Sequence, residues 1–136
     1  MFGPHLTLDL YGCNKGKLVD KDFILKILNE LPEFLGLHKL SEPVLNYYEE
    51  PTPGVSGFVI ISESHVSIHT FYEEQFASVD IFSCKTFSTK KATEYLVKEL
   101  GSTEVEKNFL MRGTHYPTDL RKAIKLAMKE REAVKV

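Results

Sequence analysis

The sequence predicts an α+β fold, a two-layer sandwich in which a mostly antiparallel sheet is covered on one face by helices. Two observations lead to this prediction. Segments that are apolar at every second position, or apolar throughout, are interrupted by two segments with apolar residues at helical spacing. The resulting order is strand–helix–strand, two more strands, then strand–helix–strand. Such a sheet must bury one face under its helices, and its edges invite pairing with a second copy.

The N-terminal third supplies a strand and a helix. Residues 5–11 alternate between apolar and polar side chains, which is typical of a strand, and a turn follows at Gly12, Asn14 and Gly16. Asp20 caps a helix that ends in the mid-thirties, where Pro32 and Gly36 stand. The apolar residues of this helix share one face: Phe23, Ile24, Ile27, Leu28 and Leu31.

The middle of the chain reads as consecutive strands. Residues 44–48 form a short strand, 49–54 a loop, and 55–62 a buried strand rich in Val and Ile. Residues 65–71 alternate, which places three polar side chains on one face of a strand, namely His65, Ser67 and His69. Residues 76–84 form the next strand, with one face shared by Asp80, Phe82 and Cys84.

The C-terminal part repeats the helix–strand order. Ser88 caps a second helix that Gly101 closes, and its inner face carries Ala92, Tyr95, Leu96 and Leu100. Residues 105–111 form a strand and 112–117 a loop, after which a last helix begins at Thr118 or Asp119. We therefore expect a domain over 1–116 with a helical extension over 117–136 that packs on the domain or on a neighbouring subunit.

Bulk properties exclude several classes of function. The chain has 136 residues, which suits one domain with a real core, and its formal net charge of -2 gives no reason to expect a nucleic-acid partner. No apolar run is long enough to span a bilayer, and the N-terminus lacks a signal-peptide layout. Two cysteines are too few for a disulfide scaffold, so we expect a reducing, cytoplasmic setting without a membrane partner.

The most informative residues are Glu63-Ser64, with His69 five positions later and Cys84 at the end of the following strand. Together they suggest self-cleavage. The Ser64 hydroxyl attacks the Glu63 carbonyl to give an ester, and a base then removes the α-proton of Ser64 so that the ester is eliminated. The dehydroalanine that remains hydrolyses to a pyruvoyl group and releases ammonia. This cofactor forms a Schiff base with an amine substrate and accepts electrons as carbon dioxide leaves.

His69 and Cys84 also have plainer interpretations. His69 could supply the base, or it could be an ordinary strand histidine. Cys84 could reprotonate the α-carbon as a general acid, or it could be a free core cysteine. Cys13 is assigned a structural role. His65 and His69 lie about 13 Å apart along a strand, too far to share one ion, and we expect no metal.

The sequence resembles the S-adenosylmethionine decarboxylase family in its short prokaryotic, pyruvoyl-dependent form. The resemblance is carried by residues 63–70 (ESHVSIHT) and 79–84 (VDIFSC), by 54–57 (GVSG), and by His5-Leu6 and 9–13 near the N-terminus. It extends from about residue 3 to 112. Family members act as dimers of cleaved protomers, and their product supplies aminopropyl groups for spermidine synthesis.

The resemblance implies a role for several residues of this chain. Ser64 is the pyruvoyl precursor, and cleavage after Glu63 gives chains 1–63 and 64–136. His69 is the proton acceptor and donor of processing, and Ser56 helps to stabilise the oxyester. Cys84 is the catalytic proton donor.

Substrate contacts are implied by the same resemblance. Glu73 holds the ribose hydroxyls, and Phe71 stands where the family has a tryptophan that stacks on adenine. The family has a second aromatic that stacks on adenine, and in this chain Glu50 stands at that position. Tyr47 or Tyr48 could supply the missing ring if the loop is shifted. The sequence also departs from the family at Glu74-Gln75-Phe76, where a glycine and a tyrosine are usual, and at Lys85, which replaces a glycine.

These departures leave two alternatives open. A substrate without adenine, such as arginine or ornithine, would not need the aromatic clamp, and acids such as Glu50 or Glu74 could meet its cationic side chain. The second alternative is a regulatory homologue that never cleaves, against which Ser64, His69, Ser56 and Cys84 argue.

Overall fold

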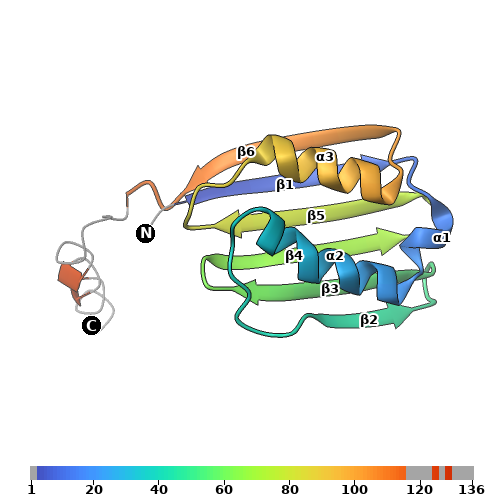
Figure 1. The fold of residues 1–136 in the computed structure, drawn as a ribbon, viewed down its shortest axis with the longest axis horizontal. Helices are drawn as coiled ribbons and strands as arrows, with labels where there is room; N and C mark the ends of the chain where they lie inside the picture. The colour runs from blue at the N-terminus through green and yellow to red at the C-terminus, as the bar shows by residue number, and fades with distance from the viewer. Residues whose placement is uncertain (1–2, 116–123, 126–127, 130–136) are drawn as a thin grey trace.

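The structure is a computed structural model that describes residues 3–115, 124–125 and 128–129 (Figure 1). In chain order its elements are β1 (Gly3–Tyr11), α1 (Lys15–Leu18), α2 (Lys21–Phe34), β2 (Val44–Tyr48), β3 (Gly54–Ile61), β4 (Ser64–Phe71), β5 (Phe76–Ser83), α3 (Thr89–Leu100) and β6 (Glu104–Arg112). No helix in the described ranges is long and apolar enough to cross a membrane.

The strands form one sheet in the order β2-β3-β4-β5-β1-β6, and neighbouring strands are antiparallel throughout. Helices α2 and α3 lie on the same face, α2 against β3 and β4 and α3 against β1 (Figure 1). The predicted α+β sandwich is therefore confirmed, with a sheet that is wholly antiparallel in the described residues. The opposite face of the sheet carries no helix in this part of the chain.

Local capping explains where the helices begin and end. The side chains of Asp20 and Ser88 accept hydrogen bonds from backbone N–H groups three residues later, as the sequence predicted for α2 and α3. Gly101 has φ 65°, the left-handed conformation that ends a helix without a steric penalty. The predicted turn after β1 contains the short helix α1, because Asn14 caps it by accepting from the Lys17 N–H.

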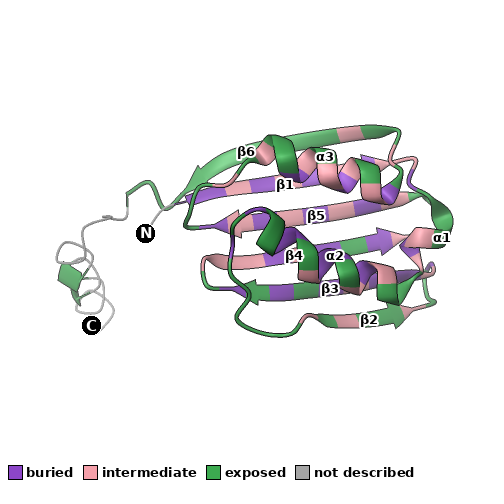
Figure 2. Cartoon of the chain, in the orientation of Figure 1, coloured by how far each residue is buried: buried purple, intermediate pink, exposed green. Residues whose placement is uncertain are grey.

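Alternation along the strands separates core from surface. The buried side chains of β4 are Val66, Ile68 and Thr70, whereas His65, Ser67 and His69 point to the other face, as predicted. Buried and partly exposed positions alternate in the same way along β1 and β5, but β6 is exposed at nearly every position (Figure 2). The helix-covered face of the sheet is therefore the core, and the other face remains accessible.

Some boundaries differ from the sequence predictions. Cys84 lies just beyond β5, which ends at Ser83, and Arg112 belongs to β6 rather than to the following loop. Most of the predicted last helix, from Thr118 or Asp119 onward, lies outside the described residues. The division into 1–116 and 117–136 thus stays a prediction.

Thr70 provides a test of this core. Its hydroxyl is fully buried, donates to the Leu18 carbonyl (2.6 Å) and accepts from the Val55 N–H (2.8 Å). The substitution Thr70→Val keeps the shape but leaves both backbone groups without this partner. We expect the free energy of unfolding in urea to fall by about 1–3 kcal/mol. Thr7→Val, on the open face of β1, is the control, and an equal loss in both variants would contradict the assignment.

Candidate active site

The Glu63–Ser64 peptide lies where β3 turns into β4. Ile61 ends β3 opposite Ser64, which begins β4, so Ser62 and Glu63 form a two-residue turn. On its other side Ser64 pairs with Ser83, the last residue of β5. Ser64 is partly exposed, and its Oγ lies 3.4 Å from His65 Nδ1.

The backbone N–H of Cys84 donates a hydrogen bond to the carbonyl oxygen of Glu63, with N and O 2.9 Å apart. This carbonyl is the group that the Ser64 hydroxyl would attack. A donor held at that oxygen stabilises the negative charge that develops during attack. The sequence suggested a role for the Cys84 thiol but gave no sign of this backbone contact, because every residue except proline has a backbone N–H group. The exposed thiol of Cys84 lies on the same residue.

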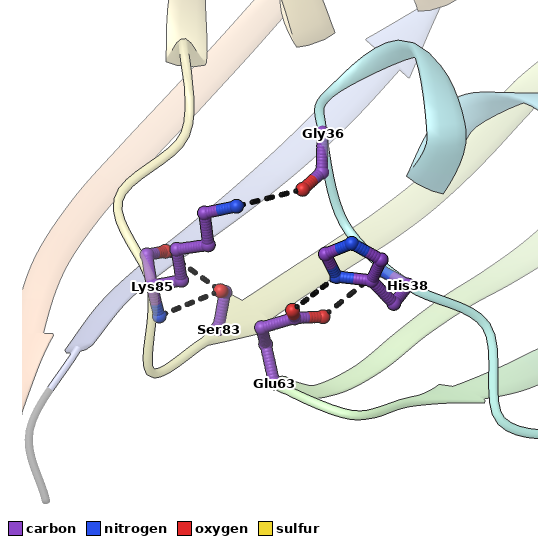
Figure 3. Close-up of polar contacts among 5 residues, drawn as sticks. All are labelled: Gly36, His38, Glu63, Ser83 and Lys85. Carbon is purple, nitrogen blue, oxygen red and sulfur yellow. Dashed lines mark hydrogen bonds and ion pairs between the residues drawn. The ribbon is translucent and has the colours of Figure 1, made fainter.

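The side chain of Glu63 is held by the loop after α2 (Figure 3). Its carboxylate accepts from the His38 N–H (3.0 Å) and lies 2.9 Å from His38 Nδ1. Burial alone would raise the pKa of the Glu63 carboxyl, but hydrogen bonds from the His38 backbone and ring, and from Ser62, outweigh burial and lower the pKa to about 2. Glu63 is therefore ionised at neutral pH.

The turn after β5 is also fixed (Figure 3). The Ser83 hydroxyl donates to the Lys85 carbonyl (2.6 Å) and accepts from the Lys85 N–H (2.9 Å). The Lys85 ammonium donates to the Gly36 carbonyl (3.0 Å) in the loop after α2. Cys84, between these two residues, is thereby held beside the Glu63–Ser64 peptide. We call Glu63, Ser64 and Cys84 the cleavage group.

A second group of predicted residues lies at the other end of β4. Ser56 faces His69 in the register of β3 and β4, and Ser56 Oγ is 2.8 Å from His69 Nδ1. Phe71 follows two residues later on the same face, and Glu73 is exposed in the turn to β5. We call Ser56, His69, Phe71 and Glu73 the histidine group. The sequence named Ser56 and His69 separately, and the register of β3 and β4 makes them neighbours.

The two groups are separated within one chain. Ser64 and His69 are five positions apart on a regular strand, a distance of about 16 Å at the usual rise per residue. His69 therefore cannot reach the α-proton of Ser64 in its own chain while β4 stays intact. Residues that were predicted from the sequence as one site therefore lie in two separate groups within a single chain.

A groove on the open face runs between the two groups. Its volume is about 500 Å³, within the range of small-molecule sites. Its lining combines polar residues with side chains that are apolar and unusually exposed, among them Val44 (50%), Phe58 (43%) and Ile60 (46%). The polar residues of its lining are Asn46, Ser56, Ser64, His65, Ser67 and His69. Contiguous exposed apolar surface of this kind marks an interaction site.

Aromatic rings continue from the histidine group across the sheet. Phe71 stacks on Phe76 with ring centroids 5.6 Å apart, and Phe76 contacts Tyr11 at 5.2 Å. In the sequence Phe76 stood out only as a departure from the resemblance, because the pairing of Phe71 with Phe76 is visible only in the sheet. Of the two tyrosines considered for the missing ring, Tyr48 donates to the Thr70 carbonyl (2.9 Å), and Tyr47 is 45% exposed.

The remaining cysteine has a different environment. Cys13 is fully buried, its thiol donates to the Leu10 carbonyl (3.5 Å), and burial raises the pKa of the thiol to about 11. Cys13 and Cys84 are both free thiols. Within the described residues no cluster of three or more His, Cys, Asp or Glu side chains could hold a metal ion.

Comparisons with known proteins agree on one family. The sequence model of the family described as S-adenosylmethionine decarboxylase matches residues 4–113. An S-adenosylmethionine decarboxylase proenzyme of Clostridium botulinum (strain Langeland) is 36% identical over 112 residues, covering 82% of this chain and 94% of the relative. The proenzyme of Geobacillus kaustophilus is 37% identical over 121 residues, covering 89% and 94%.

A solved structure agrees as well. The crystal structure of the adenosylmethionine decarboxylase from Aquifex aeolicus matches with a TM-score of 0.74 and 26% sequence identity. The match covers 87% of this chain and 95% of that chain. The shared fold therefore includes nearly the whole of the Aquifex protein.

The ionised Glu63 gives a pH-dependent prediction. Its folded-state pKa of about 2 lies below the ordinary value of 4.5, so its contribution to stability is present above pH 4.5 and is lost as the pH falls toward 2. In chains kept whole by Ser64→Ala, Glu63→Gln should lower the free energy of unfolding more at pH 6 than at pH 3. Urea denaturation at both pH values measures the difference. Glu74→Gln is the matched control, and a pH-independent loss on Glu63→Gln would refute the assignment.

Proposed function

Since the chain belongs to the S-adenosylmethionine decarboxylase family, we propose that it is a proenzyme that cuts itself between Glu63 and Ser64 and then decarboxylates S-adenosylmethionine. The observation that carries the proposal is the hydrogen bond from the Cys84 N–H to the Glu63 carbonyl (2.9 Å), next to the Ser64 hydroxyl. It sets a donor at the oxygen where charge must develop during self-cleavage.

Self-cleavage follows from the chemistry of these residues. The Ser64 Oγ bonds to the Glu63 carbonyl carbon, the Glu63–Ser64 C–N bond breaks, and the hydroxyl proton passes to the new amine. His69 then removes the α-proton of Ser64, and the Cβ–Oγ bond of Ser64 breaks, which forms dehydroalanine and releases the α-carboxylate of Glu63 as a new C-terminus. Water hydrolyses the dehydroalanine to a pyruvoyl group and ammonia. Ser56, hydrogen-bonded to His69, orients its ring and supports the ester intermediate.

The pyruvoyl group of Ser64 supplies an electron sink when the amine of the substrate binds to it. The chain's own residues do the rest. The exposed thiol of Cys84 lies on the residue whose N–H meets the Glu63 carbonyl, so it stands beside the new cofactor and can return a proton to the α-carbon. Cys13 is excluded from this role because it is buried and its pKa is raised to about 11. A reducing cytoplasm suits a site that needs a free thiol.

The separation of the two groups leads us to propose a homodimer. The exposed apolar side chains of the groove need a cover, and a second copy with a two-fold axis brings the same face against itself. In such a face-to-face pair, antiparallel β4 strands bring the histidine group of one chain over the cleavage group of its partner. His69 then acts on the Ser64 of the partner, which overcomes the separation of about 16 Å within one chain.

Substrate binding is assigned to the histidine group. The exposed carboxylate of Glu73 can accept from two ribose hydroxyls. Phe71 and Phe76 offer ring faces to adenine, and stacking on such a ring contributes about 1–3 kcal/mol per base. Tyr48, near the Thr70 carbonyl, is the better replacement for the ring missing at Glu50, because Tyr47 projects from the other face of β2. These contacts, with the names of the relatives, favour adenosylmethionine over arginine, ornithine or a non-cleaving regulatory role.

An intact mass spectrum of the purified protein tests the proposal. We expect two chains, 1–63 and 64–136, with the second lighter by one ammonia than a fragment that starts with serine. Ser64→Ala should give one whole, folded and inactive chain. Cys84→Ala is the matched control, since it keeps the backbone N–H; it should still cleave but lose most decarboxylation of S-adenosylmethionine. Cleavage of the Ser64→Ala chain, or a wild-type chain that never cleaves, would refute self-processing at this site.

Mixed dimers test the partner's role. His69→Ala and Ser64→Ala chains, each expressed alone, should stay uncut. When the two are co-expressed with different affinity tags, the Ser64→Ala chain supplies His69 and the His69→Ala chain supplies Ser64. We expect only the His69→Ala chain to be cut, which gel electrophoresis of doubly tagged dimers would show. Failure to cut in verified mixed dimers would mean that His69 does not act across the interface.

A further inference from the structure

His38 contacts both residues of the turn in which cleavage is proposed, and Figure 3 shows its contacts with Glu63. Its carbonyl accepts from the Ser62 N–H (2.8 Å), and its own N–H donates to Glu63 Oε1 (3.0 Å). Its ring adds a third contact, from Nδ1 to Glu63 Oε2 (2.9 Å). Because an ionised carboxylate only accepts hydrogen bonds, Nδ1 must carry the proton.

The same loop also reaches the opposite side of the Glu63–Ser64 peptide. The Lys85 ammonium binds the Gly36 carbonyl (3.0 Å), two residues before His38. Cys84, which donates to the Glu63 carbonyl, directly precedes Lys85. The loop after α2 is therefore tied both to the turn that carries the peptide and to the turn that carries its hydrogen-bond donor.

The arrangement matters because Glu63 has two groups that contain oxygen, its backbone carbonyl and its side-chain carboxylate. Its carbonyl must stay on the Cys84 N–H while the Ser64 hydroxyl attacks. Its carboxylate is charged, and a like charge near the developing oxyanion would oppose the attack. The carboxylate is instead held at His38, where the Glu63 side chain is only 9% exposed although the histidine ring is 70% exposed.

We propose that His38 is a positioning residue for self-cleavage, whose ring fixes the Glu63 carboxylate so that the Glu63 carbonyl stays on the Cys84 N–H. The inference rests on the proposed self-processing and concerns only its first step, in which the Ser64 Oγ–carbonyl carbon bond forms, the C–N bond breaks and the hydroxyl proton moves to the amine. The backbone contacts of His38 alone would hold the loop. The ring, exposed on the surface, adds the contact that orients Glu63.

Three variants separate this role from a general structural one. His38→Ala removes the ring but keeps both backbone hydrogen bonds. His38→Asn restores an N–H donor at nearly the same reach as Nδ1. Glu42→Ala, at an exposed position of the same loop, is the matched control. Each precursor is made by translation in vitro, and its conversion to 1–63 and 64–136 is followed over time by gel electrophoresis and intact mass.

We expect His38→Ala to slow cleavage about tenfold, since a hydrogen bond to a charged group is lost. His38→Asn should recover most of the rate, and Glu42→Ala should cleave like the wild type. Once fully cleaved, His38→Ala should decarboxylate S-adenosylmethionine with unchanged kcat and KM. This last measurement distinguishes positioning from a general loss of structure, which would lower turnover as well.

Several results would overturn the inference. His38→Ala could cleave at the wild-type rate, His38→Asn could fail to recover the rate, or the cleaved His38→Ala enzyme could lose kcat in proportion. A wild-type chain that never cleaves would instead remove the proposed function itself. The two failures are therefore distinguishable, because the role of His38 is judged only against a wild-type precursor that processes.

Discussion

The register between β3, β4 and β5 is the constraint on which the rest of the structure depends. Val66, Ile68 and Thr70 must face the helices, because a slip by one residue would bury His65 and His69 and expose the apolar set. The core therefore fixes which residues stand opposite each other. Through it, Ser56 meets His69 and Ser64 meets Ser83.

The proposed chemistry depends on which groups this register brings together at the two ends of β4. Where β4 begins, the hairpin turn brings the Glu63 carbonyl to the Cys84 N–H. Where β4 ends, His69 and the aromatic rings gather, about 16 Å away on a rigid strand. A single sheet cannot bring these two ends together, so the proposed site, which uses both, is completed by a second molecule. In that proposed dimer the open, partly apolar face of the sheet is the contact surface.

Three residues near the strand ends make contacts that the sequence did not indicate. Lys85, which by the resemblance replaces a glycine, ties the turn after β5 to Gly36. Phe71, which by the resemblance stands in place of a larger ring, contacts Phe76, and this pair extends the aromatic surface toward Tyr11. His38 holds the carboxylate at the cleavage point. Lys85 and Phe71, which the sequence marked as departures from the family, thus make contacts of their own in the fold.

The sequence by itself determined the α+β class, the caps at Asp20 and Ser88, and the face of β4 that carries its histidines, and it named the residues to which the chemistry is assigned in the proposed function. These follow from local periodicity and side-chain type, which are legible along the chain. Only the tertiary structure decided which of these residues lie together, in the cleavage group at one end of β4 and in the histidine group at the other. The hydrogen bond from Cys84 to the Glu63 carbonyl is donated by a backbone N–H group. The hydrogen bond from His38 to the Glu63 carboxylate joins residues 25 positions apart, and His38 lies in an irregular loop. Neither leaves a local pattern, because both depend on strand pairing that brings distant segments together.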